Sequence, residues 1–483
     1  MGMDASSRCS SHYHTMASSL SGGSRKVCVI GAAAGLLAAA GFEVTVLEAR
    51  DRVGGRIHQT PRLGLPIDIG ASWIHGTRGN PLVALAEKAG ATTVACGAVD
   101  SICGTNGEWL SRDLARHRYE EVWEILEMAM DHSRKKSAWL SDHLKMMDFF
   151  PFMGDDCENQ SLKNIWLDAG LERDNLYVAS TFGDILTGLL SPVADKATLR
   201  LNCEVTRIAN SQVGLVDIEA ADGFRDSFGS VIVTAPLGWL KRNEDVFSPP
   251  LPWRVSTAIR SLGYGNLDKV FIKFPRAFWD KRDSGANSHR AEGTGSRPFS
   301  IESLFLCPAY SDAADTNPAK WRQEIISFSG LPEPFSQPVI MFFVYGQWGR
   351  HITGLVRGMK QDSQEYYRIL NDNFQPYYSK LPNYDMTSSD CVPSKFLSTD
   401  WQNDKFAGYG SFTNQPVGSG TCSKHFRALR EGMGEDRWIW FAGEHTSRPG
   451  GLGTVTGAYW SGEQVAKRVA RRCGLTIDAQ KPV

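Results

Sequence analysis

The sequence predicts an α/β fold, and observations at the two ends of the chain support that prediction. Near the start, the β-branched run Lys26 to Ile30 predicts a strand, Gly31 to Ala40 a helix, and Glu43 to Glu48 a second strand. Near the end, Trp438 to Ala442 predicts a strand and Thr456 to Arg471 a closing helix. A β-α-β unit usually belongs to a parallel sheet that helices cover on both faces.

Between these ends the sequence predicts a mixture of helices and strands. One helix, Leu82 to Ala89, follows the turn Gly79-Asn80-Pro81. A longer one covers Arg112 to Phe150, where no Gly or Pro interrupts the helical spacing. Further strands are expected at Thr198 to Ile208, Leu215 to Ala220, Ser230 to Thr234, Val270 to Phe274 and Val339 to Tyr345. Turn residues separate the first three strands, which predicts a β-meander.

Composition narrows the class of function. The 483 residues include 52 Lys+Arg and 53 Asp+Glu, so the formal net charge is -1. Such a balance argues against a nucleic-acid partner and against a polybasic membrane surface. No long uncharged apolar run predicts a membrane span. The ten cysteines contain no C-x-x-C pair, so no metal site is expected, and most of them should be buried reduced thiols.

The first part of the chain raises the question of targeting. Residues 1–24 are rich in Ser and lack apolar periodicity, which predicts a disordered tail. The basic pair Arg25-Lys26 and the apolar stretch up to Phe42 resemble the regions of a secretion signal. However, the stretch leads directly into a second predicted strand, as it would inside a β-α-β unit. We therefore expect a cytoplasmic rather than a secreted protein.

The turn after the first predicted strand is a candidate ligand-binding loop. In dinucleotide-binding β-α-β units, backbone N–H groups of this turn meet a pyrophosphate, and a Cβ at the point of close approach would collide with it. An acidic residue that ends the second strand then accepts hydrogen bonds from a ribose. Gly31 and Glu48 occupy these places, and Gly35 closes the loop. The alternative is an ordinary β-α-β turn without a ligand.

The segment that follows favours the first interpretation and carries a family resemblance. It has the sequence Glu48-Ala49-Arg50-Asp51-Arg52-Val53-Gly54-Gly55-Arg56-Ile57. The two glycines permit a close turn, and Arg56 could meet a phosphate bidentately, which a lysine could not do. The string resembles the FAD-dependent amine oxidases of the polyamine-oxidase type, whose relatives include the monoamine oxidases and flavin-dependent histone demethylases. The resemblance extends from residue 26 to residue 471.

Further strings resemble the same family: Gly70-Ala71-Ser72-Trp73-Ile74-His75-Gly76, Val231-Ile232-Val233-Thr234-Ala235-Pro236-Leu237-Gly238, Leu262-Gly263-Tyr264-Gly265-Asn266-Leu267-Asp268-Lys269-Val270, Phe441-Ala442-Gly443-Glu444-His445-Thr446 and Gly453-Thr454-Val455-Thr456-Gly457-Ala458-Tyr459. The resemblance implies FAD as the cofactor. The backbone of Val205 would meet the adenine, and Glu444 and Val455 the ribityl and isoalloxazine parts. The implied FAD-binding residues are Gly31, Gly35, Glu48, Arg50, Gly55, Arg56, Gly70, Ala71, Ser72, Trp73, Val205, Gly443, Glu444, Thr454 and Val455.

The resemblance also implies how the chain is divided. A discontinuous Rossmann-like FAD-binding domain would comprise residues 25–100, 196–270 and 391–475. A mixed α+β substrate domain would be inserted as residues 101–195 and 271–390. Flavin and substrate would meet where the two domains adjoin, which is a usual place for a ligand pocket.

The glycine loop departs from the family pattern. The family has G-x-G-x-x-G and about 24 positions from the first glycine to the ribose glutamate. Here the span from Gly31 to Glu48 is 18 residues. The shortfall corresponds to roughly 9 Å of helix. Either the predicted chain lacks a segment through a deletion or a mis-assigned exon boundary, or the protein binds FAD in an altered way or not at all.

The resemblance assigns roles to five candidate catalytic residues. Lys269 would hold a water beside the flavin, with a surface lysine at a strand start as the alternative. Trp73, Trp401 and Phe412 would wall the flavin and sandwich the amine, because aromatic faces attract a cation; core packing is the alternative for Trp401. Plant polyamine oxidases have Tyr where this chain has Thr454, so the aromatic cage would be incomplete.

His75 stands where animal members have His and plant members Glu, which suggests a hydrogen bond to substrate; a structural histidine is the alternative. The expected function is oxidation of a polyamine (spermine, spermidine or an acetylated form) by hydride transfer to FAD, with O2 reduced to hydrogen peroxide. A histone-lysine demethylase is disfavoured, because the chain has no inserted helical-hairpin arm and no basic N-terminal module. A non-catalytic remnant is the third possibility.

Overall fold

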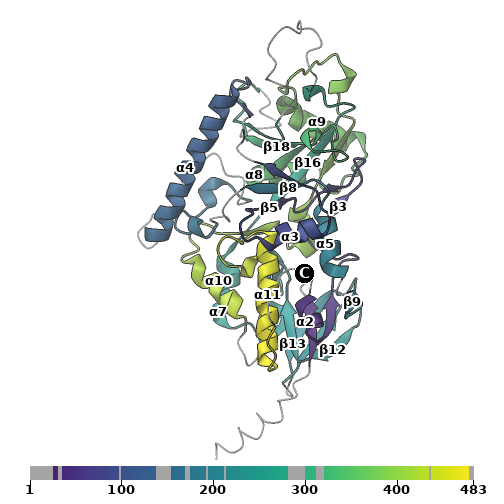
Figure 1. Cartoon of the computed structure of the whole chain (residues 1–483), viewed down its shortest axis with the longest axis vertical. Helices are drawn as coiled ribbons and strands as arrows, with labels where there is room; N and C mark the ends of the chain where they lie inside the picture. Colours follow the sequence, from purple (N-terminus) through teal and green to yellow (C-terminus); the bar gives the residue numbers. More distant parts are fainter. Residues whose placement is uncertain are drawn as a thin grey trace, which may run out of the picture.

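The computed structural model describes residues 25–30, 35–96, 99, 101–136, 154–168, 174–191, 194–211, 214–280, 300–311, 320–433 and 437–477 (Figure 1). The tail predicted at 1–24 and the loop residue Gly31 lie outside these ranges. The parallel sheet lies in the lower part of Figure 1, and the six-stranded sheet described below lies in the upper part.

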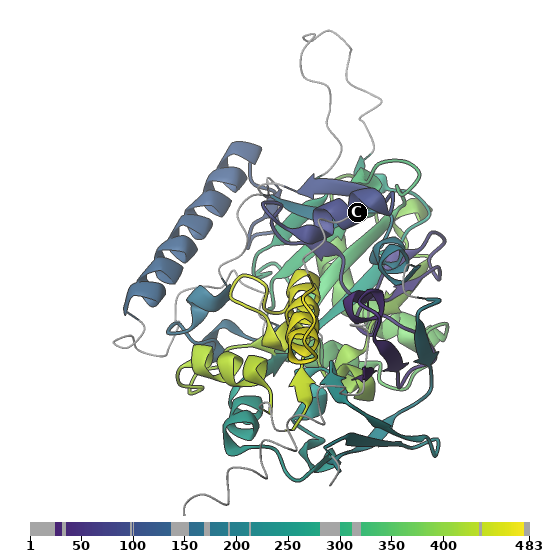
Figure 2. The same ribbon diagram turned by 60° about the horizontal axis from the view of Figure 1, so that its bottom comes forward.

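The parallel sheet has the strand order β22-β13-β1-β2-β9. Its strands are β1 (Lys26–Ile30), β2 (Glu43–Leu47), β9 (Ala197–Arg200), β13 (Ser230–Val233) and β22 (Ile439–Phe441), and every neighbouring pair is parallel. Helices α2 (Gly35–Ala39) and α11 (Val455–Arg472) pack on one face through side chains such as Leu37 and Val465. Figure 2 shows α11 in yellow near the centre of the molecule. The α/β fold class is therefore confirmed.

The opposite face of this sheet packs against a meander and three helices. The meander sheet has the order β12-β11-β10-β14, with β10 (Val205–Asn210), β11 (Val216–Ala220), β12 (Arg225–Phe228) and β14 (Phe247–Ser248). The helices are α6 (Leu237–Leu240), α7 (Trp253–Ser261) and α10 (Cys422–Glu431). Buried Phe441 and Val231 of the parallel sheet join this core. Helices therefore flank both faces, as expected.

Two of the predicted strands differ from the structure. The run Thr198 to Ile208 is two strands, β9 and β10, which belong to different sheets. The chain turns between them, where Asn202 has φ +55°, a left-handed conformation that an extended strand cannot contain. The run Ser230 to Thr234 forms β13 of the parallel sheet rather than a meander strand, because it pairs with β1.

The shortened crossover still joins the first two parallel strands. β1 and β2 pair along their whole length, from Lys26 with Glu43 to Ile30 with Leu47. The helix predicted at Gly31 to Ala40 is described only as α2, Gly35–Ala39, since residues 31–34 lie outside the described ranges. A parallel pair needs a crossover of about a dozen residues or more, which residues 31–42 supply. The shorter crossover therefore leaves the register of β1 and β2 intact.

A second, six-stranded sheet has the order β20-β16-β19-β18-β17-β7 and is antiparallel except for its β17–β7 pair. Helices α8 (Gly346–Leu355) and α9 (Gln364–Tyr378) pack on one face through residues such as Trp348 and Phe374. On the other face lies a small β5-β8-β6 sheet, which contributes Tyr177. The strands are β7 (Ile102–Cys103), β16 (Leu267–Lys273), β17 (Glu302–Phe305), β18 (Gln323–Ser327), β19 (Val339–Tyr345), β20 (Lys395–Ser398), β5 (Trp73–Ile74), β6 (Thr93–Cys96) and β8 (Asn175–Val178).

The remaining helices surround these sheets. Helix α4 (Arg112–Lys136), drawn in blue, runs along the outside of the molecule (Figures 1 and 2); the rest of the helix predicted to Phe150 lies outside the described residues. Helix α3 (Pro81–Lys88) lies one residue from its predicted bounds and contacts α5 (Phe182–Leu190). The short elements are β3 (Gln59–Thr60), β4 (Ile67–Asp68), β15 (Gly263–Gly265), β21 (Phe412–Asn414), η2 (Cys157–Asn159), η3 (Ile165–Asp168), η5 (Glu244–Val246), η6 (Phe278–Asp280), η7 (Phe328–Gly330), η8 (Ser389–Cys391), η9 (Trp401–Asn403), η10 (Lys405–Ala407) and η11 (Glu444–Thr446).

The domain boundaries stay predictions, and sheet membership differs from them at two points. Strand β16 crosses the boundary at 270, and β20, placed in the FAD-binding domain, pairs with β16 in the six-stranded sheet. Within the described ranges, none of the helices is long and apolar enough to cross a bilayer. Cysteines 28, 103, 203, 391 and 422 are buried free thiols.

Candidate active site

The carboxyl end of the parallel sheet carries Glu48. Its backbone N–H donates to the carbonyl of Arg200 at 2.9 Å, and its side chain accepts the backbone N–H of Arg50 at 2.9 Å. Burial raises the pKa of the half-buried Glu48, and the Arg50 N–H opposes that shift. Ligands of open α/β sheets bind at this edge. The structure therefore places Glu48 where the sequence predicted a ribose acceptor, whereas Gly31 lies outside the described residues.

The segment after Glu48 is held by two arginines. Arg50 Nη2 donates to both carboxylate oxygens of Asp404, at 2.8 and 2.9 Å. Arg56 Nη1 donates to the carbonyl of Ser411 at 2.6 Å and to Glu444 Oε1 at 3.0 Å. Both bonds of Arg56 use Nη1, so the predicted bidentate phosphate contact stays a prediction. Gly55 has φ +56° with open space where a Cβ would stand, so its backbone conformation rather than crowding requires glycine.

Glu444 joins three separate parts of the chain. Oε1 accepts from Arg56 and from Thr413 Oγ1, both at 3.0 Å, while Oε2 accepts the backbone N–H groups of Gly453 at 3.1 Å and Thr413 at 3.4 Å. The residue is only 3% exposed. Buried carboxylates need such partners. Glu444 therefore fixes β21 and the loop before α11 against the Arg56 segment; Gly443, just before it, has φ +125°.

Lys269 is buried, not a surface lysine. It is 4% exposed, and Nζ donates to the carbonyl of Gly70 at 2.6 Å, to Ser72 Oγ at 3.0 Å and to the carbonyl of Asp68 at 3.2 Å. Burial lowers the pKa of Lys269 to about 8, and the charge of Asp68 opposes that shift. A Cβ at Gly70 would stand 1.9 Å from the carbonyl oxygen of Arg56, so only glycine fits there.

Two acidic residues beside Lys269 had no predicted role. Asp68, 2% exposed, accepts the backbone N–H of Phe182 at 2.9 Å, and burial raises its pKa to about 7. Asp268 Oδ1 accepts from Thr399 Oγ1 at 2.6 Å and from the backbone N–H of Trp401 at 2.8 Å, and burial raises its pKa to about 6. Asp268 lies in the string that identified Lys269, but Asp68 belongs to no quoted string.

The predicted aromatic residues lie around this cluster. Trp73, on β5, meets the edge of Tyr177 with ring centroids 5.1 Å apart. Trp401 is 7% exposed, and its indole N–H donates to the carbonyl of Ile69 at 3.0 Å, next to Gly70. Phe412 begins β21, one residue before Thr413 and the Glu444 network. The structure thus brings Trp73 and Trp401 to the Lys269 side, and Phe412 to the Glu444 side.

The other predicted site residues lie on or beside β5, α11 and β10. Burial lowers the pKa of His75, which follows β5, while a hydrogen bond with the Asn175 side chain opposes the shift. Thr454 caps α11 by accepting the N–H of Gly457 at 3.0 Å, and Val455 is the first residue of that helix. Ala71 contributes to the small core beneath α3. Val205 begins β10 and is buried in the core behind the parallel sheet.

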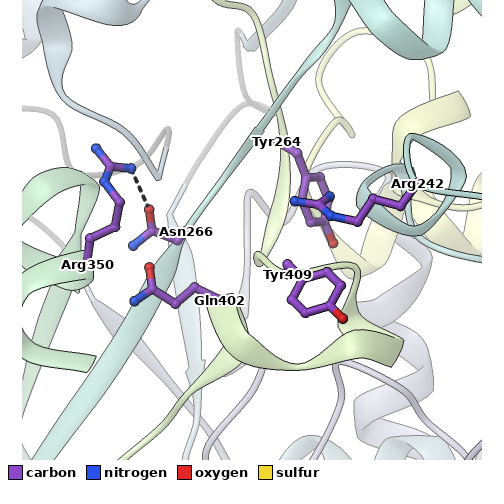
Figure 3. A pocket seen from close by; sticks show the side chains of 6 residues that line it. All are labelled: Arg242, Tyr264, Asn266, Arg350, Gln402 and Tyr409. Carbon is purple, nitrogen blue, oxygen red and sulfur yellow. Dashed lines mark hydrogen bonds between the residues drawn. The ribbon is translucent and has the colours of Figure 1, made fainter. Parts of the chain in front are cut away.

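A polar cavity of about 350 Å³ adjoins the site (Figure 3). Arg350 Nη1 donates to Asn266 Oδ1 at 3.2 Å, and the guanidinium of Arg242 lies 4.8 Å from the Tyr409 ring centroid. The cavity shares no lining residue with the Lys269 cluster. Tyr264 and Asn266 stand in the string that contains Lys269, but the sequence predicted no role for any lining residue. Its lining residues are Arg242, Tyr264, Asn266, Arg350, Gln402 and Tyr409.

The described residues fit FAD. Glu48 presents a carboxylate at the ligand-binding edge of the parallel sheet, as a ribose needs. By position, the N–H groups of Val455 and Thr456 at the start of α11 have no intrahelical acceptor, so they could donate to the electron-rich end of a flavin. Asp68 Oδ1, deeply buried beside Lys269, has no hydrogen-bond partner among the described residues. When bound, the flavin supplies the redox chemistry, and the protein supplies position and electrostatics.

Comparisons with known proteins give the same assignment. The family model described as flavin containing amine oxidoreductase matches residues 32–152 and 103–470. The chain is 30% identical to probable polyamine oxidase 4 of Arabidopsis thaliana, an alignment that covers 51% of this chain and 56% of that protein. It is 27% identical to polyamine oxidase 4 of rice, Oryza sativa subsp. japonica, over 92% of this chain and 88% of that protein.

A mouse protein, lysine-specific histone demethylase 1B, is 26% identical over 95% of this chain and 53% of its own length. The alignments thus span about half the length of the Arabidopsis and mouse proteins. The structure of a putrescine oxidase bound to putrescine superposes on this chain with a TM-score of 0.67 and 16% sequence identity. The superposition covers 93% of this chain and 99% of the putrescine oxidase, so the two proteins share a fold. The chain belongs to the flavin-containing amine oxidoreductases, and its cofactor is FAD.

Proposed function

We propose that the protein oxidises a polyamine (spermine, spermidine or an acetylated form). The overall reaction would convert the amine, one O2 and one water into an aldehyde, a shorter amine and hydrogen peroxide. Bound FAD would supply the two-electron redox chemistry of this conversion. The observation that carries the proposal is the buried Lys269, held by Gly70 and Ser72 within the family's fold.

Lys269 positions water in this proposal. A protonated amine has three N–H donors. The three contacts of Nζ use all of them, and the contact with the Asp68 carbonyl, at 3.2 Å, is the longest. A water at the site takes the N–H that makes this longest contact. Since the pKa of Lys269 is about 8, the amine can also accept a hydrogen bond from the water once it is neutral.

The aromatic residues hold the substrate amine. Phe412 and Trp73 would wall the amine with aromatic faces, which attract a cation. The indole N–H of Trp401 is already committed to the Ile69 carbonyl, so Trp401 acts as a wall and not as a donor. His75 has a lowered pKa and is neutral at pH 7, so it can accept a hydrogen bond from a substrate ammonium.

The relatives favour polyamine oxidation over histone demethylation. The rice polyamine oxidase aligns with this chain over 88% of its own length, whereas the mouse demethylase aligns over only 53%. The test is anaerobic reduction of the bound flavin, followed at roughly 450 nm, with spermidine, spermine and a dimethyl-lysine peptide. The proposal expects bleaching by a polyamine and none by the peptide. Bleaching by the peptide alone would indicate a demethylase, and protein that purifies without flavin and binds none would indicate a non-catalytic remnant.

A further inference from the structure

The six described residues that line the polar cavity include neither Asp nor Glu. They form two groups on opposite sides of the cavity (Figure 3): Arg242, Tyr264 and Tyr409 on one side, and Asn266, Arg350 and Gln402 on the other. Arg242 and Tyr409 are exposed, so the cavity opens to solvent. Its volume of about 350 Å³ falls in the range of small-molecule pockets, about 300–1,000 Å³.

The backbone holds Arg242 in place. Its Nη1 donates to the carbonyl of Gly238 at 3.0 Å and to that of Gly408 at 3.3 Å. These glycines pack so closely that a Cβ on Gly238 would stand 2.1 Å from the Gly408 carbonyl oxygen. The guanidinium also lies 4.8 Å from the Tyr409 ring centroid, as stacked arginines do. The side chain is therefore fixed before any ligand arrives, which lowers the entropic cost of binding.

One edge of the Arg242 guanidinium has no partner among the described residues. A guanidinium carries five N–H donors in a planar fork. None of the described residues accepts a hydrogen bond from Nε or Nη2 of Arg242 or forms an ion pair with it. Nε and Nη2 form one edge of the fork, and such an edge matches the two oxygens of a carboxylate. Arg242 thus offers a bidentate site and an uncompensated positive charge.

The opposite side of the cavity adds polar groups but little net charge. Arg350 donates to Asn266 Oδ1 at 3.2 Å and lies 3.7 Å from the carboxylates of Asp155 and Asp156, which balance its charge. The side chain of Gln402 makes no hydrogen bond with any described residue, so its amide is available to a ligand. With one unpaired positive charge, the cavity suits a monoanion better than a dianion such as phosphate.

We propose that this cavity binds a small carboxylate. The carboxylate lies on the Nε–Nη2 edge of Arg242, and a polar group of the same molecule meets Gln402 on the opposite side. Gln402 follows Trp401, and Asn266 precedes Lys269 by three residues, so the site adjoins the active site without sharing a lining residue with it. The inference does not rest on the proposed function, because it holds whichever amine is oxidised.

The test uses the full-length protein with excess FAD, so that no carboxylate occupies an empty flavin site. N-acetylglycine and its neutral amide, N-acetylglycinamide, are titrated by ligand-observed NMR. The parent should bind the carboxylate about 10- to 100-fold more tightly than the amide, because only the carboxylate forms charge-assisted hydrogen bonds with Arg242. Arg242→Met should abolish that preference, whereas Gln402→Ala should weaken both ligands alike.

The matched control is Arg200→Met. The Arg200 guanidinium lies 4.7 Å from the Phe224 ring centroid, but it lies outside the cavity, so both affinities should stay as in the parent. Urea denaturation checks that Arg242→Met is folded; if it is not, the two ligands in the parent and in Gln402→Ala decide the question.

Three results would overturn the assignment. The first is equal affinity for the two ligands, or saturable binding of neither, in the parent. The second is a parental preference for the carboxylate in folded Arg242→Met, or parental affinities in Gln402→Ala. The third is tighter binding of inorganic phosphate than of N-acetylglycine at constant ionic strength, which would contradict a site for a monoanion.

Discussion

Lys269 Nζ donates a 2.6 Å hydrogen bond to the carbonyl oxygen of Gly70, a residue 199 positions earlier in the chain. The bond ties the six-stranded sheet to the segment that follows the parallel-sheet unit. Gly70 itself packs against the Arg56 carbonyl so closely that no side chain fits. The Lys269 side chain is thus fixed relative to the Arg56 segment through the backbone of Gly70.

Lys269→Met should keep FAD and slow turnover with polyamines. Met has similar length and apolar volume, but it cannot hold a water. Water-positioning or acid–base groups contribute about 10²–10⁴-fold, so the loss should appear in stopped-flow flavin reduction, in reoxidation by O2, or in both. Lys269→Arg keeps the charge, but its planar fork does not replace a compact ammonium.

The matched control is Lys273→Met on the same strand, where Nζ donates to the Leu63 carbonyl instead. This change should leave the rates as in the parent. Parental rates of reduction and reoxidation in Lys269→Met would make Lys269 a structural residue.

Glu444→Ala should destabilise the protein strongly. The substitution removes four acceptor contacts and leaves the Arg56 guanidinium without its carboxylate. Breaking a buried pair costs about 3–5 kcal/mol of unfolding free energy. Urea denaturation measures the cost. Glu431→Ala, which removes a surface partner of Arg254, is the control and should cost about 1 kcal/mol or less; equal costs would contradict the buried network.

Asp268 should make stability depend on pH. Its pKa is raised from 3.8 to about 6 by burial, so the folded state holds the proton more tightly than the unfolded state. The contribution of this group is therefore fully present below pH 3.8 and is lost as pH rises through about 6. Relative to Asp268→Asn, whose side-chain oxygen can still accept hydrogen bonds, the parent should lose about 3 kcal/mol between pH 3.5 and 7.5. Parallel stability curves from urea denaturation would refute the shift.

Glu48→Ala should weaken FAD binding. Losing a charge-assisted hydrogen bond to the ribose costs about 1.5–3 kcal/mol of binding free energy. Glu43→Ala, an exposed glutamate at the other end of β2, is the control. Fluorescence titration of apoprotein with FAD gives both dissociation constants, and an unchanged value for Glu48→Ala would remove this residue from the site.

Lengthening the short glycine loop should improve FAD binding. Inserting six residues between Ile30 and Ala38, so that the loop has the spacing G-x-G-x-x-G, should raise the fraction of protein that purifies with FAD, because the helix N-terminus then reaches the pyrophosphate. The measurement is the ratio of flavin to protein absorbance. Stoichiometric flavin in the chain as it stands would show that the shortening is harmless.

Sequence patterns found those parts of the site that lie in contiguous strings. Lys269, Glu48 and Glu444 stand in such strings, and the structure places all three in hydrogen-bonded networks. Asp68 was missed because its importance comes from burial beside a lysine on a strand about 200 positions away, which local sequence cannot show. Roles assigned from the resemblance, such as those of His75 and Val205, remain predictions.

The fold, like the site, has parts that local sequence patterns predict and parts that they do not. The β-α-β unit and the closing strand and helix were predictable, because each has a local pattern. The split of Thr198 to Ile208 into strands of two sheets was not, because it depends on which strands pair with each half.

Anaerobic mixing of the FAD-loaded protein with spermidine and spermine tests the central claim most directly. The account predicts that a polyamine bleaches the flavin absorbance at roughly 450 nm. Admission of O2 should then restore the absorbance and yield one hydrogen peroxide per flavin. A flavin that stays oxidised with both polyamines, in protein shown to bind FAD stoichiometrically, would contradict the proposed function.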